Sequence, residues 1–218
     1  MLARFAPLAL PLLLALAAAA PAPRPTPLPD TIDVAITTDL GVVTVTLDGR
    51  HAPVTTANFL RYVDQRRFDG TVFYRVMRLA WGEQPNGLIQ GGTQGDPKRI
   101  LKPIAHEPTS ATGLSHKAGA ISMARYAPGT ATGDFSILLS DLTSLDADLA
   151  AADTEGRAGF AAFGHVSAGM DVVRRIYDVP LSPTAGVGVM KGQMIAKPVR
   201  ILTVRRLPVT AKTVPAGP

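Results

Sequence analysis

The chain has 218 residues, with 22 Lys and Arg against 17 Asp and Glu, a formal net charge of +5 at pH 7 and no cysteine. This length suits one domain with appendages, and the lack of cysteine excludes disulfides, thiolate catalysis, thiolate metal sites and lipid attachment through a cysteine. The basic residues form no run, so a solvated surface is favoured over a nucleic-acid interface.

The first thirty residues have the pattern of an export signal followed by a linker. Arg4 precedes an apolar block over residues 8–20, and its last three alanines supply small residues for cleavage. The pattern predicts a signal peptide over residues 1–20, with an uncleaved anchor as the alternative. No second apolar run is long enough to span a bilayer. Prolines at every second position predict an extended linker over residues 21–30.

The first elements of the folded part are a hairpin and a helix. Residues 32–47 alternate between apolar and polar around a central turn, which predicts a β-hairpin. Residues 53–67 change to helical spacing and predict a helix that is capped by Thr55 or Thr56.

The remainder of the chain predicts short strands between irregular loops. A second helix is predicted over residues 167–177, and long loops over residues 79–87, 92–119 and 140–159. The predicted strands cover residues 72–77, 89–92, 120–124, 135–139, 160–166 and 199–207.

The order of these elements predicts the fold class. About eight strands without alternating helices argue against a βαβ sheet and favour a mainly β fold, a closed or nearly closed antiparallel barrel capped by two helices. This domain is predicted to cover residues 31–209, with a flexible tail over residues 210–218.

Hydrolase and metal motifs are weak in this sequence. There is no Gly-x-Ser-x-Gly and no His-Glu-x-x-His pattern. The pair Asp146 and Asp148 is followed by alanines rather than calcium ligands. Neither a metal nor a cofactor is expected. The histidines share no ligand spacing and are interpreted as surface or loop residues; they are His51, His106, His116 and His165.

Several segments together resemble one known family. They are Phe73-Tyr74-Arg75-Val76, Gln90-Gly91-Gly92, residues 119–125 (Gly-Ala-Ile-Ser-Met-Ala-Arg), residues 163–166 (Phe-Gly-His-Val) and residues 169–173 (Gly-Met-Asp-Val-Val). In this order the chain resembles the cyclophilins, which are peptidyl-prolyl cis-trans isomerases, and an exported bacterial member in particular. The resemblance covers residues 32–207 and implies a closed eight-stranded barrel. It also implies a periplasmic enzyme that acts on proline-containing polypeptides without metal, nucleic acid or membrane partners.

The resemblance also implies a site. Arg75 would donate a hydrogen bond to the proline nitrogen in the twisted transition state, and Gln90 would bind the substrate backbone or orient Arg75. From the residues alone, a solvated strand residue in an ion pair is the favoured interpretation of Arg75, and the resemblance reverses that preference. The implied substrate-binding residues are Phe73, Leu88, Met123, Ala124, Arg125, Asp134, Ser136, Leu145 and Phe160.

The chain departs from the family pattern in the proline pocket. Ser136 and either Gly87 or Leu88 stand where phenylalanines are usual, and each lost ring weakens proline burial by about 1–3 kcal/mol. Asp134 is expected either to pair with Arg75 or to select basic substrates. The sequence therefore predicts an isomerase of reduced activity. A non-catalytic proline-peptide binding or chaperone module is the main alternative, and a barrel that binds another small ligand is the third.

Overall fold

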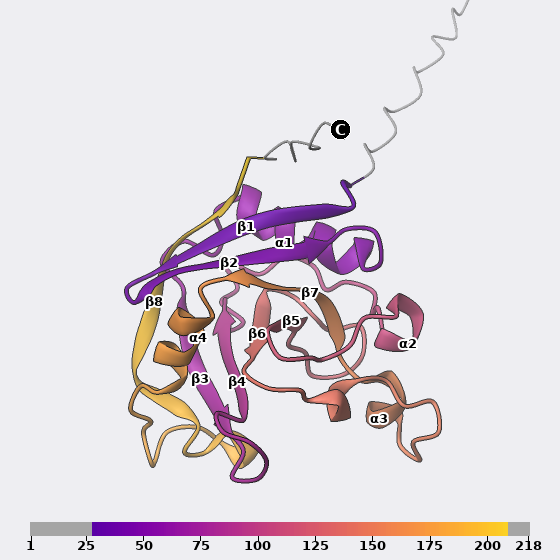
Figure 1. The fold of residues 1–218 in the computed structure, drawn as a ribbon. Coiled ribbons are helices and arrows are strands. Elements are labelled where there is room, and N and C mark those ends of the chain that lie inside the picture. Colours follow the sequence, from indigo (N-terminus) through magenta and orange to yellow (C-terminus); the bar gives the residue numbers. More distant parts are fainter. Residues whose placement is uncertain (1–27, 209–218) are drawn as a thin grey trace, which may run out of the picture.

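Eight antiparallel strands form a closed barrel in the computed structural model, which describes residues 28–208 (Figure 1). The strand order is β1-β2-β7-β5-β6-β4-β3-β8, and β8 pairs with β1 to close it. The predicted mainly β barrel is confirmed. The strands are β1 (Thr31–Thr38), β2 (Gly41–Asp48), β3 (Val72–Arg78), β4 (Gly87–Gly92), β5 (Ala120–Met123), β6 (Asp134–Leu138), β7 (Ala161–Ala168) and β8 (Met194–Arg206).

The predicted hairpin is formed by β1 and β2. They pair from Thr31 opposite Asp48 to Thr38 opposite Gly41. Every second side chain of the hairpin is buried, as alternation with one face on a core requires. The predicted signal peptide, most of the linker and the tail lie outside the described residues.

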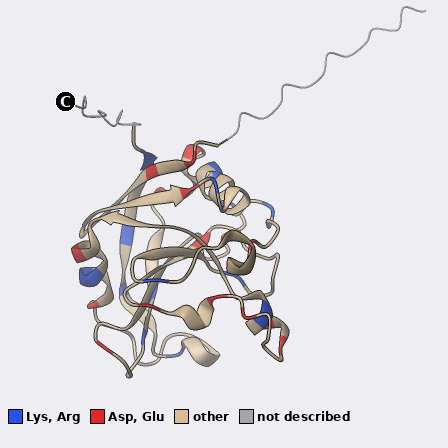
Figure 2. Ribbon diagram, turned by 45° about the vertical axis from the view of Figure 1, so that its right-hand side comes forward, with Lys and Arg blue, Asp and Glu red and all other residues tan. Residues whose placement is uncertain are grey.

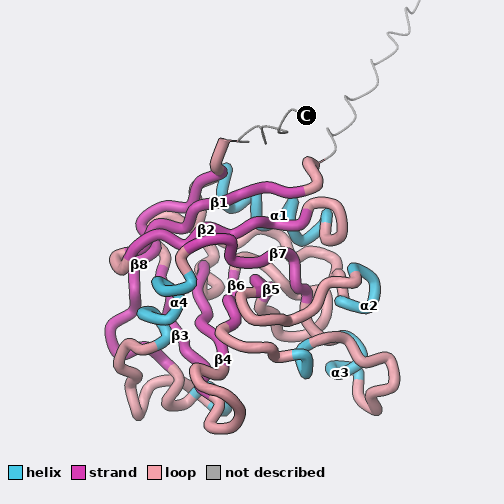
Figure 3. Tube along the Cα trace, viewed as in Figure 1, coloured by secondary structure: helices cyan, strands magenta, loops and turns pink. Residues whose placement is uncertain are grey.

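Four α-helices accompany the barrel within residues 28–208 (Figure 3). The two predicted helices are α1 (Pro53–Asp64), which packs on β2, β7 and β8, and α4 (Met170–Tyr177), which packs on β2 and β4. Two short helices were not predicted, α2 (Thr109–Thr112) and α3 (Thr154–Ala158), and both lie in predicted loops. In the described part of the chain, no helix has the length and apolarity to cross a membrane.

The start of α1 differs from the prediction that a threonine caps it. Thr55 and Thr56 are buried inside the first turn. The carboxylate of Glu107, far along the chain, instead accepts hydrogen bonds from the backbone N–H groups of Val54 (3.0 Å) and Thr55 (2.6 Å). A carboxylate satisfies the unpaired N–H groups of a helix start and interacts favourably with the helix dipole.

Several element boundaries also differ from the predictions, and two of them have a clear cause. Helix α1 ends at Asp64 rather than at residue 67, because Arg66 adopts a left-handed backbone conformation with φ of 55°. Strand β8 begins at Met194 rather than at residue 199. Residues 194–198 were not predicted as part of the strand because Pro198 cannot donate to a β-ladder and argues against a strand there.

The barrel interior is filled by aromatic rings and branched side chains. The Phe59 ring lies 4.9 Å from that of Phe68 and 5.4 Å from that of Phe135. Phe73 is fully buried and meets Phe135 edge-on at 5.8 Å. A core packed in this way leaves no room for a ligand inside the barrel, so a binding site has to lie on its outer face.

Charged residues are interspersed over the molecule rather than confined to one element. Figure 2 shows cationic and anionic positions along helices, strands and loops alike. Among the described residues, two ion pairs are bidentate: Arg205 of β8 with Asp69 at 2.8 Å and 2.6 Å, and Arg206 with Asp64 at 2.7 Å and 2.6 Å. Hydrogen bonding to the Arg205 guanidinium lowers the pKa of Asp69.

Candidate active site

A β-bulge in β3 brings Arg75 to the outer face of the barrel. Phe73 pairs with Gly91 and Arg75 pairs with Gln90, so β3 uses one residue more than β4. Tyr74 is that extra residue. Without it, Phe73 and Arg75 would point to the same face, because side chains alternate along a strand. The bulge lets Phe73 fill the core while Arg75 faces outward.

Two rows of side chains then cross the outer face of four adjacent strands. The polar row runs Arg75–Gln90–Ser136–Ser122, where each residue is the cross-strand partner of the next. The apolar row runs Met77–Leu88–Leu138 in the same way. A cationic donor at one end of a polar row, beside an apolar row, suits a peptide with one apolar residue and a polar backbone.

These rows form the floor of a groove of about 200 Å³. Its walls come from the residues after β5, from the 3-10 turn η1 (Thr143–Leu145) and from the start of β7. The groove is lined by Arg75, Met77, Leu88, Gln90, Ser122, Met123, Ala124, Arg125, Ser136, Leu138, Leu145, Phe160 and Met190.

The guanidinium of Arg75 is held by two side-chain amides. Its Nε donates to Oε1 of Gln193 at 2.8 Å, and its Nη1 donates to Oε1 of Gln90 at 2.7 Å. The amide nitrogen of Gln90 in turn donates to the hydroxyl of Tyr74 at 2.7 Å. Among the described residues, Arg75 forms no ion pair with a carboxylate and its Nη2 makes no hydrogen bond. The site therefore presents an oriented cation with N–H groups to spare.

Burial shifts the pKa values around this cation. Desolvation lowers the pKa of Arg75 and raises the pKa of Tyr74. A guanidinium nevertheless stays protonated in proteins, and the tyrosine stays a neutral phenol. The donor at the groove therefore keeps its positive charge without a titrating partner.

All but two of the predicted site residues meet in this groove. The exceptions are Phe73, whose ring belongs to the barrel core, and Asp134, at the first position of β6. The carboxylate of Asp134 accepts a hydrogen bond from the backbone N–H of Gln94 at 2.7 Å, and burial raises its pKa. It thus holds the loop after β4 and does not pair with Arg75, which corrects the expectation from the sequence.

Several groove residues were not predicted. Met77, Ser122 and Leu138 lie on strands that were located. Counting alternate positions from Arg75, Ala124 and Ser136 would have found them. Gln193 follows a 3-10 turn (Gly188–Met190) and lies 118 positions from Arg75 in the chain. It carries no local signal, and neither does Met190.

His116 is fully buried, which corrects its interpretation as a surface or loop residue. Its Nδ1 lies 2.5 Å from Oδ1 of Asp146, and its Nε2 lies 2.8 Å from Oγ of Ser122. A carboxylate only accepts, so Nδ1 carries a proton and the neutral ring accepts the Ser122 hydroxyl proton at Nε2. Burial lowers the pKa of His116, and the hydrogen bond that the ring donates to Asp146 opposes this shift.

This trio has the residue types of a serine hydrolase but not its surroundings. Ser122 is only 3 % exposed, and β5 pairs with β6 and β7, so its N–H groups are used in the ladder. A nucleophilic serine needs free N–H donors for the developing oxyanion. The contacts of His116 with Asp146 and Ser122 instead connect the turn that carries Leu145 to the floor of the groove. Within residues 28–208, no group of three or more His, Asp or Glu is arranged to hold a metal ion.

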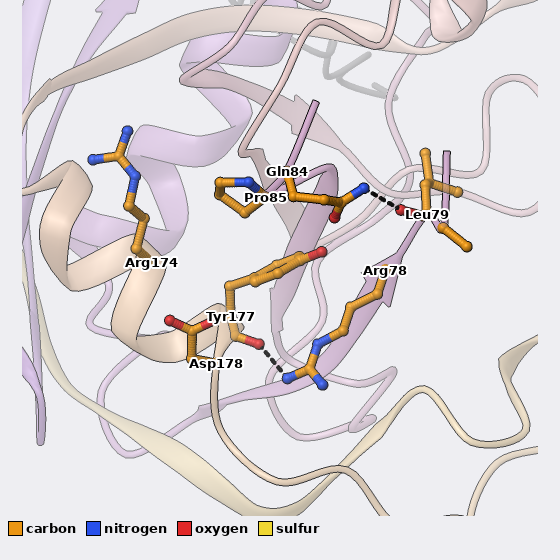
Figure 4. Close-up of a pocket in the computed structure, with 8 residues that line it drawn as sticks. Arg78, Leu79, Gln84, Pro85, Arg174, Tyr177 and Asp178 are labelled. Atoms are coloured by element: carbon orange, nitrogen blue, oxygen red, sulfur yellow. Dashed lines mark hydrogen bonds between the residues drawn. The ribbon is translucent and has the colours of Figure 1, made fainter. Parts of the chain in front are cut away.

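A larger cavity of about 660 Å³ lies between the loop before β4 and α4 (Figure 4). Arg78 points across it and donates to the carbonyl oxygens of Tyr177 (2.6 Å) and Val179 (2.9 Å). Gln84 donates to the carbonyl oxygen of Leu79 at 3.0 Å. The polar groups of Arg78 and Gln84 are engaged by main-chain acceptors, so they fix the loop on α4. Arg174 and Asp178 also line this cavity.

Comparison with known proteins adds independent information. The sequence model of the family described as cyclophilin type peptidyl-prolyl cis-trans isomerase/CLD matches residues 33–206. A protein of Acinetobacter baylyi named peptidyl-prolyl cis-trans isomerase is 36% identical over 176 residues, which cover 79% of this chain and 84% of that protein. Peptidyl-prolyl cis-trans isomerase A of Dickeya dadantii is 33% identical over 150 residues, which cover 67% of this chain and 71% of that protein.

A solved structure has the same fold. The Cryptosporidium parvum cyclophilin type peptidyl-prolyl cis-trans isomerase, crystallised in the presence of the dipeptide Ala-Pro, superposes with a TM-score of 0.63 at 20% sequence identity. The match covers 81% of this chain and 99% of that one. At this identity the likeness concerns the fold alone.

Proposed function

The chain belongs to the cyclophilin-type peptidyl-prolyl cis-trans isomerase family, and from this premise we propose that Arg75 is the group that accelerates isomerisation. The observation that carries the proposal is the guanidinium oriented by Gln90 and Gln193, beside an apolar row and without a carboxylate partner among the described residues.

The mechanism follows from the chemistry of the amide. The barrier to rotation about an X–Pro bond comes from resonance that draws the nitrogen lone pair into the C–N bond, and it amounts to about 18–20 kcal/mol. In the twisted transition state the lone pair returns to nitrogen, which becomes a hydrogen-bond acceptor. A donor fixed at that position binds the transition state more tightly than either planar ground state and so lowers the barrier.

The surroundings of Arg75 favour this role. Gln193 and Gln90 fix two of its nitrogens, so little freedom is lost when a remaining N–H group meets the substrate. Partial burial strengthens the hydrogen bond to the proline nitrogen. The reaction makes and breaks no covalent bond, so the residues need neither a nucleophile nor a proton acceptor.

The proline ring would lie against the apolar part of the groove, with Met123, Leu145 and Phe160 around it. Ser136 replaces a ring in the floor, and Leu88 provides an aliphatic surface in place of an aromatic one. Proline burial is therefore less favourable, and we propose a higher KM than in members with two phenylalanines.

We further propose that the protein acts on exported polypeptides in the periplasm, on the basis of the predicted signal peptide over residues 1–20. Expression of the full chain followed by fractionation and N-terminal sequencing tests this. A processed protein in the periplasmic fraction supports export, and an unprocessed protein in the cytoplasmic fraction contradicts it.

Exchange NMR on a proline-containing peptide tests the catalytic proposal. Wild type should accelerate cis-trans exchange, whereas Arg75→Ala should be slower by about 10²–10³-fold, the loss usual for one preorganised donor. Peptide binding without any acceleration by wild type would instead favour the non-catalytic binding module.

A further inference from the structure

The groove contains two cationic side chains and, among the described residues that line it, no anionic one. The two are Arg75 and Arg125. Asp134, the carboxylate expected at the site, is turned to the backbone of the loop after β4. Any group that enters the groove therefore meets an excess of positive charge.

Arg125 is buried and only partly satisfied. Its side chain is 1% exposed and its guanidinium lies over the ring of Phe160 at 4.6 Å. The Nη1 atom donates to the carbonyl oxygen of Tyr126 at 2.9 Å, and Nη2 donates to the carbonyl oxygen of Gly159. The Nε atom is buried without a hydrogen-bond partner within the described chain. An unpaired buried donor on a cation is costly, so the contacts of Arg125 satisfy its charge only in part.

The carboxylate that neutralises Arg125 belongs to an exposed residue, Glu155. Glu155 of α3 reaches Nη1 at 2.6 Å, but its own side chain is 58% exposed. Ion pairs with an exposed partner contribute little and are screened by salt. A carboxylate that enters the groove can therefore compete with Glu155 for the positive charge of Arg125.

We propose that the groove selects peptides with a carboxylate side chain next to the proline, and that Arg125 determines this specificity. The inference rests on the proposed isomerase function. With the prolyl nitrogen at Arg75, the residue beside the proline extends across the groove towards Arg125. Arg125 lies two residues after β5, and strands β3 and β5 are three strand spacings apart in the barrel order, or about 14 Å along the barrel wall. The side chains of Arg75 and Arg125 and a substrate glutamate together are long enough to span that distance.

This preference is opposite to one of the two alternatives that the sequence left for Asp134, the selection of basic substrates. A lysine beside the proline would be brought near two cations and no lining carboxylate. Burying such like charges together is unfavourable, so discrimination comes from repulsion of the basic peptide as well as attraction of the acidic one.

The test uses three peptides that differ only in the residue before proline, which is Glu, Gln or Lys. Wild-type kcat/KM should fall in that order, with about a tenfold difference between the Glu and Lys peptides at low salt. The difference should shrink at high salt, since the charges are screened. Equal kcat/KM for the Glu and Lys peptides would overturn the proposal.

Three variants separate the roles of the charges. Arg125→Gln should abolish the preference, and Arg125→Lys should keep most of it. Glu155→Gln, a change at an exposed position, should increase it because the competing carboxylate is removed. Asp134→Asn is the matched control and should leave it unchanged. An unchanged preference in Arg125→Gln, or a lost preference in Asp134→Asn, would assign selectivity to other residues and refute the proposal.

The two proposals fail in different ways. If wild type accelerates none of the three peptides, the proposed catalytic function fails. The charge preference is then read from peptide dissociation constants by chemical-shift titration, where the Glu peptide should still bind about tenfold more tightly than the Lys peptide. Equal dissociation constants would refute the charge preference.

Discussion

Replacing His116 should change how stability depends on pH. The ring is fully buried, and burial lowers its pKa below the ordinary value of 6.5. The folded chain therefore excludes a proton that the unfolded chain binds once the pH falls below about 6.5. Stability is full above that pH and decreases as the pH falls, by at most about 1.4 kcal/mol per pH unit, until the lowered pKa of the folded state is reached.

His116→Gln should remove this slope. At neutral pH the variant should also be less stable by about 1–3 kcal/mol, because the contacts from Nδ1 to Asp146 and from Nε2 to Ser122 are replaced imperfectly. The slope is the more specific readout, since it depends on titration and not only on packing.

Urea unfolding from about pH 7.5 to about pH 5.5 measures both effects. The difference in unfolding free energy between wild type and His116→Gln cancels the contribution of other titrating groups. His165→Gln, at an exposed strand position, is the matched control and should keep the wild-type slope. If the stability advantage of wild type over His116→Gln grew on acidification, the pair with Asp146 would outweigh burial and the reasoning would be refuted.

Three further changes test other parts of the structure. Gln193→Ala removes the acceptor for Nε of Arg75 and should lower kcat/KM about tenfold in the exchange assay without changing the unfolding midpoint; an unchanged rate would show that Gln193 does not orient the cation. Ser136→Phe restores a ring in the groove and should lower KM about tenfold for a proline peptide; a raised KM would show that the groove cannot hold the ring. Glu107→Gln weakens the cap on α1 and should cost about 0.5–2 kcal/mol in urea unfolding, whereas Glu83→Gln in an exposed loop should cost nothing, and equal effects would refute the capping role.

Sequence patterns predicted those elements whose structure depends on the spacing of neighbouring residues in the chain. The hairpin follows from alternation, and α1 follows from helical spacing. Most of the groove could be named because the residues that resemble the family, such as Arg75 and Gln90, lie on strands whose pairing brings them together.

The remainder depends on contacts between distant segments. Phe73 was placed in the groove because the bulge at Tyr74 is invisible to a period-two pattern. Glu107 at the start of α1 and Gln193 at Arg75 act from loops without periodicity. His116 is buried because Asp146 and Ser122 satisfy it, which is a pairing that no spacing along the chain reveals.

The central claim is that Arg75 stabilises the transition state rather than the bound peptide. The direct test measures, for Arg75→Ala and wild type, the peptide dissociation constant and the exchange rate at saturating enzyme. We predict a dissociation constant within about fivefold of wild type and an exchange rate lower by about 10²–10³-fold. An unchanged exchange rate would contradict the claim, as would a loss of binding that accounts for the whole loss of activity.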